Sequence, residues 1–277
     1  MNIIKADRYF KENLKNILEN GSVDENPRPH YKDGTPAHTK FITNVFEKYD
    51  LSKGEFPITT LRNTAIKTGI REILWIYQAQ SNNLEKAKEL KVNWWHPWDI
   101  GDNTIGKRYG YTVYKYDLLN RLLEGLKENP FSRRHIINLY QYTDLDSSEG
   151  LYPCAYETVW SVREYEGELY LDTHLNQRSS DYVTANYINK AQYVSLQLMV
   201  CGHLGYKPGT FSHMVNNLHI YDRHINAAKE ILDRPVSQLQ PIIKLKNNKN
   251  FYDYNVNDFI IYNNTGRKLE SPLEIAV

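Results

Sequence analysis

Apolar residues recur at helical spacing in three segments of the first half of the chain. In each segment they return every three or four positions, the pattern of an amphipathic helix with one buried face. The positions are Phe10, Leu14, Ile17 and Leu18, then Ile66, Ile70, Ile73, Leu74 and Tyr77, and then Leu118, Leu119, Leu122, Leu123 and Leu126. Gly21 and the pair Asn129-Pro130 are stop signals after the first and third helices, and the turn-rich segment 26–36 predicts a loop.

From residue 154 onward the spacing becomes that of half-buried strands, with apolar residues at every second position. The side chains expected to share a face are Cys154, Tyr156, Thr158, Trp160 and Val162, then Leu169, Leu171, Thr173 and Leu175, and then Phe211, His213, Val215, Asn217 and His219. A hairpin turn is expected at 164–167. Residues 187–203 return to helical spacing and predict a central core helix, and a further helix is expected over about 221–232. Helices and strands without regular βαβ alternation indicate the α+β class.

Length and composition exclude several classes of protein. The 277 residues contain no repeat, low-complexity tract or linker, so a single domain, 1–277, is expected. The net charge of +1 argues against the broad basic surface of a duplex-binding protein. Two cysteines are too few for a disulfide framework and fit a reducing compartment. Neither a signal-peptide core nor a run of about 18 apolar residues is present, and a cytoplasmic protein is expected.

Reactive and anion-binding side chains are concentrated between residues 151 and 221. Leu-Tyr-Pro precedes Cys154, Asn-Gln-Arg-Ser-Ser-Asp occupies 176–181, and Asn189 and the His-Ile-Tyr run at 219–221 follow. A cysteine thiolate can add to C6 of a pyrimidine and thereby make C5 nucleophilic. A neighbouring guanidinium would lower the pKa of the thiol. Taken alone, Cys154 would more often be a small buried side chain, which is the interpretation kept for Cys201.

These motifs, and their context from Arg28 to Val277, resemble the thymidylate synthase family. The resemblance implies an α+β fold with a large mixed sheet covered by helices, and a homodimer formed sheet to sheet. It implies that dUMP is reductively methylated to dTMP. The one-carbon unit and the hydride would come from 5,10-methylenetetrahydrofolate, which leaves as dihydrofolate, and no metal is implied.

On the nucleotide side, the resemblance implies that Cys154 attacks the base. Asn189 would read the uracil edge, donating to O4 and accepting from N3–H. The phosphate would be bound by guanidinium forks and one hydroxyl, and the ribose 3′-hydroxyl by a His/Tyr pair. The residues so assigned are Arg28, Arg178 and Ser179 for phosphate, with Arg133 and Arg134 reaching it from the other subunit, and His219 and Tyr221 for ribose.

On the folate side, the resemblance implies an acid–base carboxylate, a tyrosine near the C5 proton, and a flat-ring pocket under a C-terminal lid. Glu72 stands among apolar helix residues, so burial would raise its pKa; the alternative is an exposed helix glutamate. Tyr109 is the tyrosine. The folate-binding residues are Asp181, Trp95, Trp98 and Val277, with a core role as the alternative for the tryptophans.

Six positions depart from the residues that are usual in the family, mostly on the folate side. They are Leu61, His96, Thr184, Ala185, Tyr187 and Asn217. None belongs to the thiol, the phosphate arginines or Asn189, so dUMP methylation is the first interpretation. Because a wetter folate site would let water capture the one-carbon unit, a dUMP hydroxymethylase is one alternative. A catalytically silent nucleotide- or RNA-binding homologue is another, although a pure binder has no need of the thiol.

Overall fold

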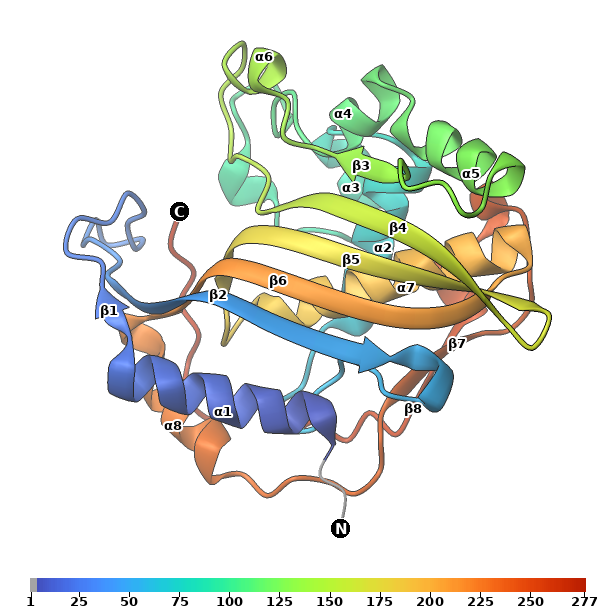
Figure 1. Cartoon of the computed structure of the whole chain (residues 1–277). Coiled ribbons are helices and arrows are strands. Elements are labelled where there is room, and N and C mark those ends of the chain that lie inside the picture. Colours follow the sequence, from blue (N-terminus) through green and yellow to red (C-terminus); the bar gives the residue numbers. More distant parts are fainter. Residues whose placement is uncertain (1–3) are drawn as a thin grey trace.

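A six-stranded mixed sheet forms the centre of the computed structural model, which describes residues 4–277 (Figure 1). The first three residues of the expected domain 1–277 lie outside that range. The strand order is β1-β2-β6-β5-β4-β3, in which β5 and β6 are parallel and the other neighbours antiparallel. β7 (Ile242–Leu245) and β8 (Phe259–Tyr262) form a separate two-stranded sheet. The six strands are β1 (Ser22–Val23), β2 (Thr39–Asp50), β3 (Ile136–Asn138), β4 (Ala155–Tyr165), β5 (Glu168–Asp181) and β6 (Lys207–Tyr221).

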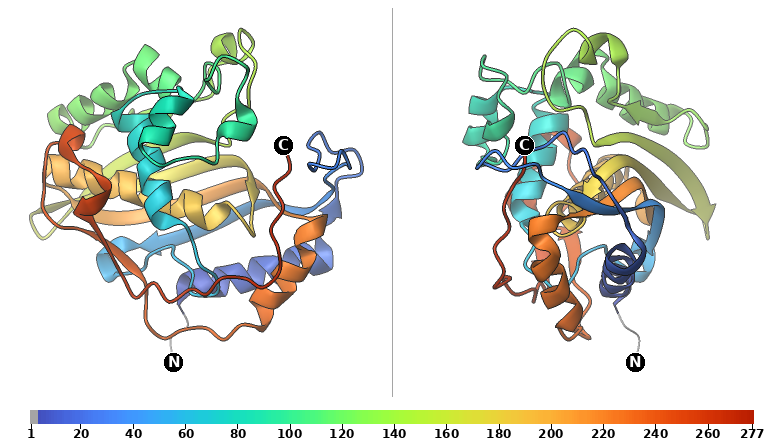
Figure 2. Two further views of the ribbon diagram at one scale, coloured as in Figure 1. Left: turned by 180° about the vertical axis from the view of Figure 1, so that it is seen from behind. Right: turned by 90° about the vertical axis from the view of Figure 1, so that its left-hand side faces the viewer.

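Helices cover one face of this sheet and leave the other face uncovered within the chain (Figures 1 and 2). This arrangement confirms the predicted α+β class with a large mixed sheet. No helix in residues 4–277 combines the length and the apolar character needed to cross a membrane. The helices are α1 (Lys5–Asn20), α2 (Ile66–Ile73), α3 (Leu84–Glu89), α4 (Gly110–Lys115), α5 (Leu118–Glu128), α6 (Tyr142–Leu145), α7 (Asn186–Leu204) and α8 (Ile225–Asp233).

The central helix α7 connects the parallel strands β5 and β6 and lies between the sheet and α2. Nearly every side of α7 is buried, beyond the single stripe that the spacing predicted. Two of its buried polar side chains are paired with the sheet: Lys190 binds Glu47 of β2 at 2.5 Å, and Gln197 donates to two backbone oxygens of β5 and β6. These contacts fix the N-terminal turn of α7, which carries Asn189, relative to the sheet.

The hairpin β4–β5 forms at the predicted place, but the expected strand face at its start is wrong. Residues 166 and 167 both have positive φ, 53° and 76°, as a tight two-residue hairpin turn requires. A bulge between Ala155 and Glu157 adds one residue to β4, which reverses the alternation on the Cys154 side of it. Ala155, in place of Cys154, therefore shares the buried face with Thr158 and Trp160. Cys154 lies just before the strand.

Two predicted helices have different boundaries, and among the strands that were not predicted (β1, β2, β3, β7 and β8) β2 is the longest. The helix expected from Ile66 to Tyr77 is α2 followed by a π-helical turn, Leu74–Gln78. The helix expected from Tyr221 begins only at Ile225, because β6 and a 3₁₀ turn, Asp222–His224, come first. The sequence of β2 gave no signal, because most of its side chains are exposed or half-buried and their burial does not alternate.

Candidate active site

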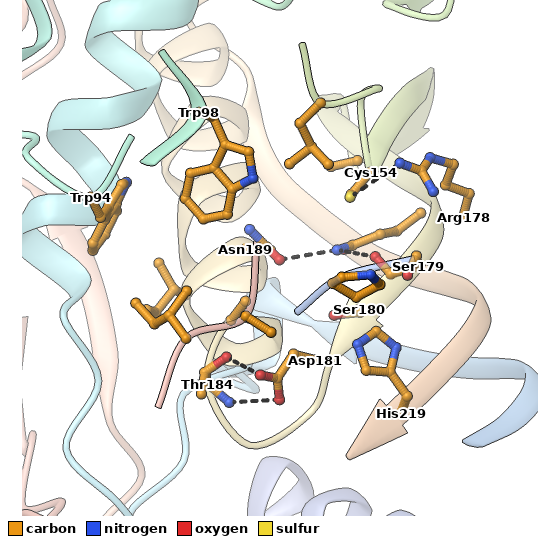
Figure 3. Close-up of a pocket in the computed structure, with 18 of the residues that line it drawn as sticks. Trp94, Trp98, Cys154, Arg178, Ser179, Ser180, Asp181, Thr184, Asn189 and His219 are labelled. Carbon is orange, nitrogen blue, oxygen red and sulfur yellow. Dashed lines mark hydrogen bonds between the residues drawn. The ribbon is translucent and has the colours of Figure 1, made fainter. Parts of the chain in front are cut away.

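A cavity of about 490 Å³ opens where the carboxyl ends of β5 and β6 meet the N-terminus of α7 (Figure 3). Helix α2, the segment 94–98, the loop around Arg28 and the C-terminal residues 274–277 complete its wall. The residues that the sequence assigned to the site and that line the cavity are Arg28, Glu72, Trp95, Trp98, Tyr109, Cys154, Arg178, Ser179, Asp181, Asn189, His219, Tyr221 and Val277.

Cys154 lies beside Arg178 in this wall (Figure 3). Its Sγ atom is 3.6 Å from Nη2 of Arg178, and the same guanidinium donates to the backbone oxygens of Tyr152 (2.7 Å) and Pro153 (3.0 Å). Since these carbonyls directly precede the cysteine, the thiol and the guanidinium are held together. Burial raises the pKa of Cys154; the charges of Arg178 and Arg28 lower it, as expected of a neighbouring guanidinium, but they offset only part of that rise.

Tyr109 is hydrogen-bonded to the backbone of the cysteine. The amide of Cys154 donates to its Oη at 3.1 Å. Tyr109 has a φ of 50°, a left-handed conformation that costs a non-glycine residue backbone strain. Burial raises its pKa well above the usual range, so the side chain is a neutral phenol. It can donate a proton or orient a water, but it is not itself ionised to act as a base.

Hydrogen bonds hold both ends of the Asn189 carboxamide. Its Oδ1 accepts from Gln177 at 3.0 Å, and its Nδ2 donates to Gln192 at 2.9 Å. The same Nε2 of Gln177 donates to the backbone oxygen of Ser179 at 3.0 Å, while its Oε1 accepts from the buried His213 at 2.9 Å. A backbone carbonyl can only accept, so it fixes the orientation of Gln177 and through it that of Asn189. One acceptor site and one N–H of Asn189 remain for a ligand.

Glu72 is buried, with 6% of its surface exposed, so the alternative of an exposed helix glutamate is wrong. Burial raises its pKa to about 7, although hydrogen bonds to the carboxylate favour the ionised form and lower the pKa. One of these bonds comes from the indole of Trp94, which the sequence analysis had not assigned to the site. A carboxyl group with this pKa can hold or release a proton near neutral pH.

The two assigned tryptophans occupy different positions. Trp95 is only 8% exposed and packs edge-on against Trp98 and Tyr109, with ring centroids 5.5 and 5.2 Å away. It therefore belongs to the hydrophobic core and also reaches the cavity. Trp98 is less buried and presents an indole to the cavity, as does Trp94 (Figure 3).

Asp181 is held by its own loop at the end of β5. Its Oδ1 accepts from the backbone amides of Val183 (3.0 Å) and Thr184 (3.1 Å), and its Oδ2 accepts from the hydroxyl of Thr184. Arg62, which precedes α2 in the chain, donates to the backbone oxygen of Thr184 at 3.0 Å and so supports the loop. The departure at Thr184 thus supplies a hydrogen bond that the family's usual apolar residue would not.

The C-terminal residues close one side of the cavity. Val277 and His30 exchange two backbone hydrogen bonds, of 3.0 and 2.9 Å, so the end of the chain pairs with the loop that carries Arg28. His219 lines the same cavity; burial lowers its pKa, which keeps the imidazole neutral. Its Nδ1 is 3.0 Å from Oδ1 of Asn217, another of the six departures.

Comparison with known proteins identifies the family. A family model described as thymidylate synthase matches residues 8–273. Thymidylate synthase of Streptococcus pneumoniae (strain 70585) is 47% identical over 277 residues, 99% of each chain. That of Lactococcus lactis subsp. cremoris (strain SK11) is 47% identical over 276 residues, 98% of this chain and 99% of the other. The solved structure of thermostable thymidylate synthase A from Bacillus subtilis matches with a TM-score of 0.88 at 34% identity, over 98% of this chain and 99% of that one. The chain belongs to the thymidylate synthase family.

Membership of the thymidylate synthase family confirms the resemblance seen in the sequence, and with it the fold and the enzyme class. Thymidylate synthases are methyltransferases that convert dUMP to dTMP with methylenetetrahydrofolate as co-substrate. In residues 4–277 no three His, Cys, Asp or Glu side chains are grouped so that they could hold a metal ion.

Arg133 and Arg134 are the assigned thymidylate synthase residues that the cavity of this chain does not contain. Both are exposed on the segment between α5 and β3. Their expected contact is with the other subunit's site, so the structure of one chain leaves that expectation a prediction.

Sequence reasoning missed several residues of this thymidylate synthase site. Gln177 lies inside the 176–181 motif and continues the buried alternation of β5 after Leu175, a signal that was available. Gln192 follows Asn189 by three positions, which places both on one side of α7. Trp94 gave no such signal, since its role depends on the packing of segment 94–98 against α2.

Proposed function

We propose that this thymidylate synthase makes dTMP from dUMP through covalent catalysis by Cys154. The observation that carries the proposal is the position of three groups in one cavity: the thiol, the guanidinium of Arg178 and the oriented carboxamide of Asn189. A protein that only binds nucleotides needs no thiol at this place. The folate co-substrate supplies the carbon and the hydride.

The residues of the chain divide the chemistry among them. Cys154 adds to C6 of the uracil ring. Its resting thiol is protonated near neutral pH and must lose this proton first, and the positive charge of Arg178 stabilises the thiolate that forms. Asn189 accepts from N3–H and donates to O4, which selects uracil. Glu72, with a pKa of about 7, holds or moves the proton needed near the base. Residues 274–277 exclude water from the cavity.

The remaining assigned residues bind the two substrates. Arg28, Arg178 and Ser179 bind the phosphate dianion, and His219 and Tyr221 bind the ribose hydroxyl. On the folate side, Asp181 and Trp98 face the cavity with Trp95 behind them, and Val277 covers it.

The proposed assembly is a homodimer formed through the uncovered face of the sheet. That face carries Phe46, which is 52% exposed and 6.1 Å from the ring of His174. Exposed aromatic residues of this kind are typical of interfaces. In the dimer, Arg133 and Arg134 of one subunit complete the phosphate site of the other.

We propose further that residues 1–277 act as one catalytic domain in the cytoplasm. One hydrophobic cluster runs from Ile4 to Phe259, which supports the single domain. The two cysteines of the sequence are both free, as a reducing compartment requires.

The deciding experiment follows two signals from one reaction of C5-tritiated dUMP with 5,10-methylenetetrahydrofolate. Equal rates of tritium release and dihydrofolate absorbance are expected, because each turnover removes one C5 proton and oxidises one folate. Tritium release without dihydrofolate would establish a hydroxymethylase instead. Bound dUMP with neither signal would establish a silent binder. Cys154→Ser is the matched variant: it should lose both signals and keep dUMP affinity.

A further inference from the structure

Arg223 joins two segments that the sequence separates by almost the whole chain. It lies in the 3₁₀ turn Asp222–His224, between β6 and α8, outside the motifs that identified the active site. On one side its guanidinium donates to Asp33 (2.7 Å) and Thr35 (2.6 Å). On the other side it donates to Glu274 at 2.7 Å. The first pair follows Arg28 in the same loop, and Glu274 begins the tail that closes the cavity.

The loop and the tail also contact each other, apart from the main hydrophobic core. Tyr31 and Ala37 of the loop form a small buried cluster with Ala276 of the tail. The backbone of His30 pairs with that of Val277, and the imidazole of His224 is 2.8 Å from the backbone oxygen of Glu274. The surface against which the tail packs is therefore formed largely by the loop that carries Arg28.

The geometry of Arg223 suits a junction better than an isolated surface ion pair. Single exposed pairs contribute little, because solvent screens them and two flexible side chains must be ordered. Here the fork meets a carboxylate on each side, and its planar face covers the ring of Tyr31 at 3.9 Å. Hydrogen bonds from Thr35 and Arg223 hold the pKa of Asp33 well below its usual range, so Asp33 stays ionised beside the guanidinium near neutral pH.

We propose that Arg223 is a positioning residue that couples closure of the C-terminal tail to the loop carrying Arg28. The inference rests on the proposed function, in which Arg28 binds the phosphate of dUMP. A phosphate held by Arg28 orders the loop, and Arg223 transmits that order to Glu274 and the tail. Such coupling is reciprocal: a closed tail strengthens dUMP binding by the same factor.

Carboxypeptidase release of Val277 measures opening of the tail without requiring turnover. In the wild-type protein, dUMP should slow the release of Val277. In Arg223→Ala, release should be faster by about five-fold or more, the lower range of typical coupling factors, and dUMP should no longer slow it. Glu274→Gln, which cuts the tail side of the junction and keeps the loop side, should behave in the same way. Arg223→Lys should be intermediate, because an ammonium lacks the fork that spans two carboxylates.

Arg8→Ala is the matched control. Arg8 is an exposed arginine over a tyrosine ring (5.3 Å) with a glutamate 3.9 Å away, but it lies on α1 and does not line the cavity. Its substitution should leave release of Val277 and the effect of dUMP unchanged. If Arg223→Ala matches Arg8→Ala in both, the proposed coupling is wrong.

Steady-state kinetics supply a second readout that a loss of stability alone would not give. Arg223→Ala should raise KM for 5,10-methylenetetrahydrofolate by about five-fold or more. It should also release more C5 tritium per dihydrofolate formed, because an open tail admits water. Unchanged values for both would contradict the proposal. A wild-type protein without dUMP methylation would remove the proposed function, yet the Val277 release assay would still decide the role of Arg223.

Discussion

At the residue scale, the base selection proposed for Asn189 depends on a neighbour that need not touch the substrate. Gln177 has its own amide fixed by the backbone oxygen of Ser179 and by His213, so it presents only a donor to Asn189. Burial lowers the pKa of His213 well below its usual value, so its neutral ring keeps a single donor for Gln177. The carboxamide of Asn189 thus cannot turn to show a donor where uracil presents N3–H.

Gln177→Leu tests this fixed orientation. Without its donor, the carboxamide of Asn189 is free to rotate, so discrimination between dUMP and dCMP should fall by about 10-fold, as expected for one lost buried hydrogen bond. Competition of the two nucleotides in a binding assay measures it. Gln197→Leu is the control, since Gln197 is equally buried but bonds only backbone oxygens of β5 and β6. It should lower stability and leave discrimination intact; equal discrimination in both variants would contradict the argument.

The raised pKa of Glu72 predicts a pH-dependent cost in stability. Its folded pKa, about 7, lies above the ordinary value of 4.5, so the folded state holds the proton more strongly. Protonation of Glu72 therefore contributes fully to the stability of the folded state below pH 4.5, and this contribution is lost as the pH rises through 7. Glu72→Gln, which mimics the protonated group, should match the wild type near pH 4.5 and be more stable above pH 8, by at most about 3 kcal/mol. Activity should be lost at both pH values.

Urea unfolding at several pH values provides the measurement for Glu72→Gln. The exposed Glu85 of α3, substituted to Gln, is the control and should show no such trend. A stability difference that does not grow with pH would mean that the Glu72 carboxyl is ionised in the folded state throughout.

At the scale of elements, the sequence predicted those whose burial is periodic. The faces of β5 and β6 and the position of α7 agree with the spacing of their apolar residues. β2 was missed because its burial does not alternate along most of its length, and the bulge between Ala155 and Glu157 was missed because an inserted residue leaves no mark on apolar spacing. The site followed the same rule. Most residues within short motifs were found, Gln177 being an exception, whereas Trp94 and Arg223 make contacts between distant segments.

The start of α4 tolerates no side chain at Gly110. A Cβ atom there would lie 2.1 Å from the backbone oxygen of Ser81, which cannot move as a side-chain end can. Gly110→Ala should therefore destabilise the protein by about 1–3 kcal/mol and displace the adjacent Tyr109 from Cys154, lowering kcat. Gly125→Ala in α5 is the control, because its Cβ would meet only the ring of His135 at 3.2 Å. Thermal unfolding of both variants decides; equal effects would show that the contact at Ser81 relaxes freely.

At the scale of the whole molecule, the chain by itself leaves two features unexplained: an uncovered sheet face and two exposed arginines that lie outside the cavity. Polar side chains on this face are hydrogen-bonded to one another: the imidazole of His174 lies 2.9 Å from Ser212 and 3.0 Å from Asn176. A homodimer through this face accounts for both features at once, since a two-fold axis would bring the arginines of each subunit toward the site of the other.

Phe46→Asp should break this dimer and, with it, the activity. Phe46 projects from β2 on the uncovered face, opposite to the buried Glu47, so a charge there would not disturb the core. Two-fold symmetry places the substitution twice in the interface, and at about 2 kcal/mol for each copy the dissociation constant should rise on the order of 1,000-fold. Sedimentation should then show a monomer, and circular dichroism an unchanged helix content. Steady-state kinetics should show a raised KM for dUMP and little turnover. Tyr114→Asp, at an exposed position of α4 outside the sheet, should remain dimeric and active. A fully active Phe46→Asp monomer would mean that the site of one chain is complete without Arg133 and Arg134 of the partner subunit.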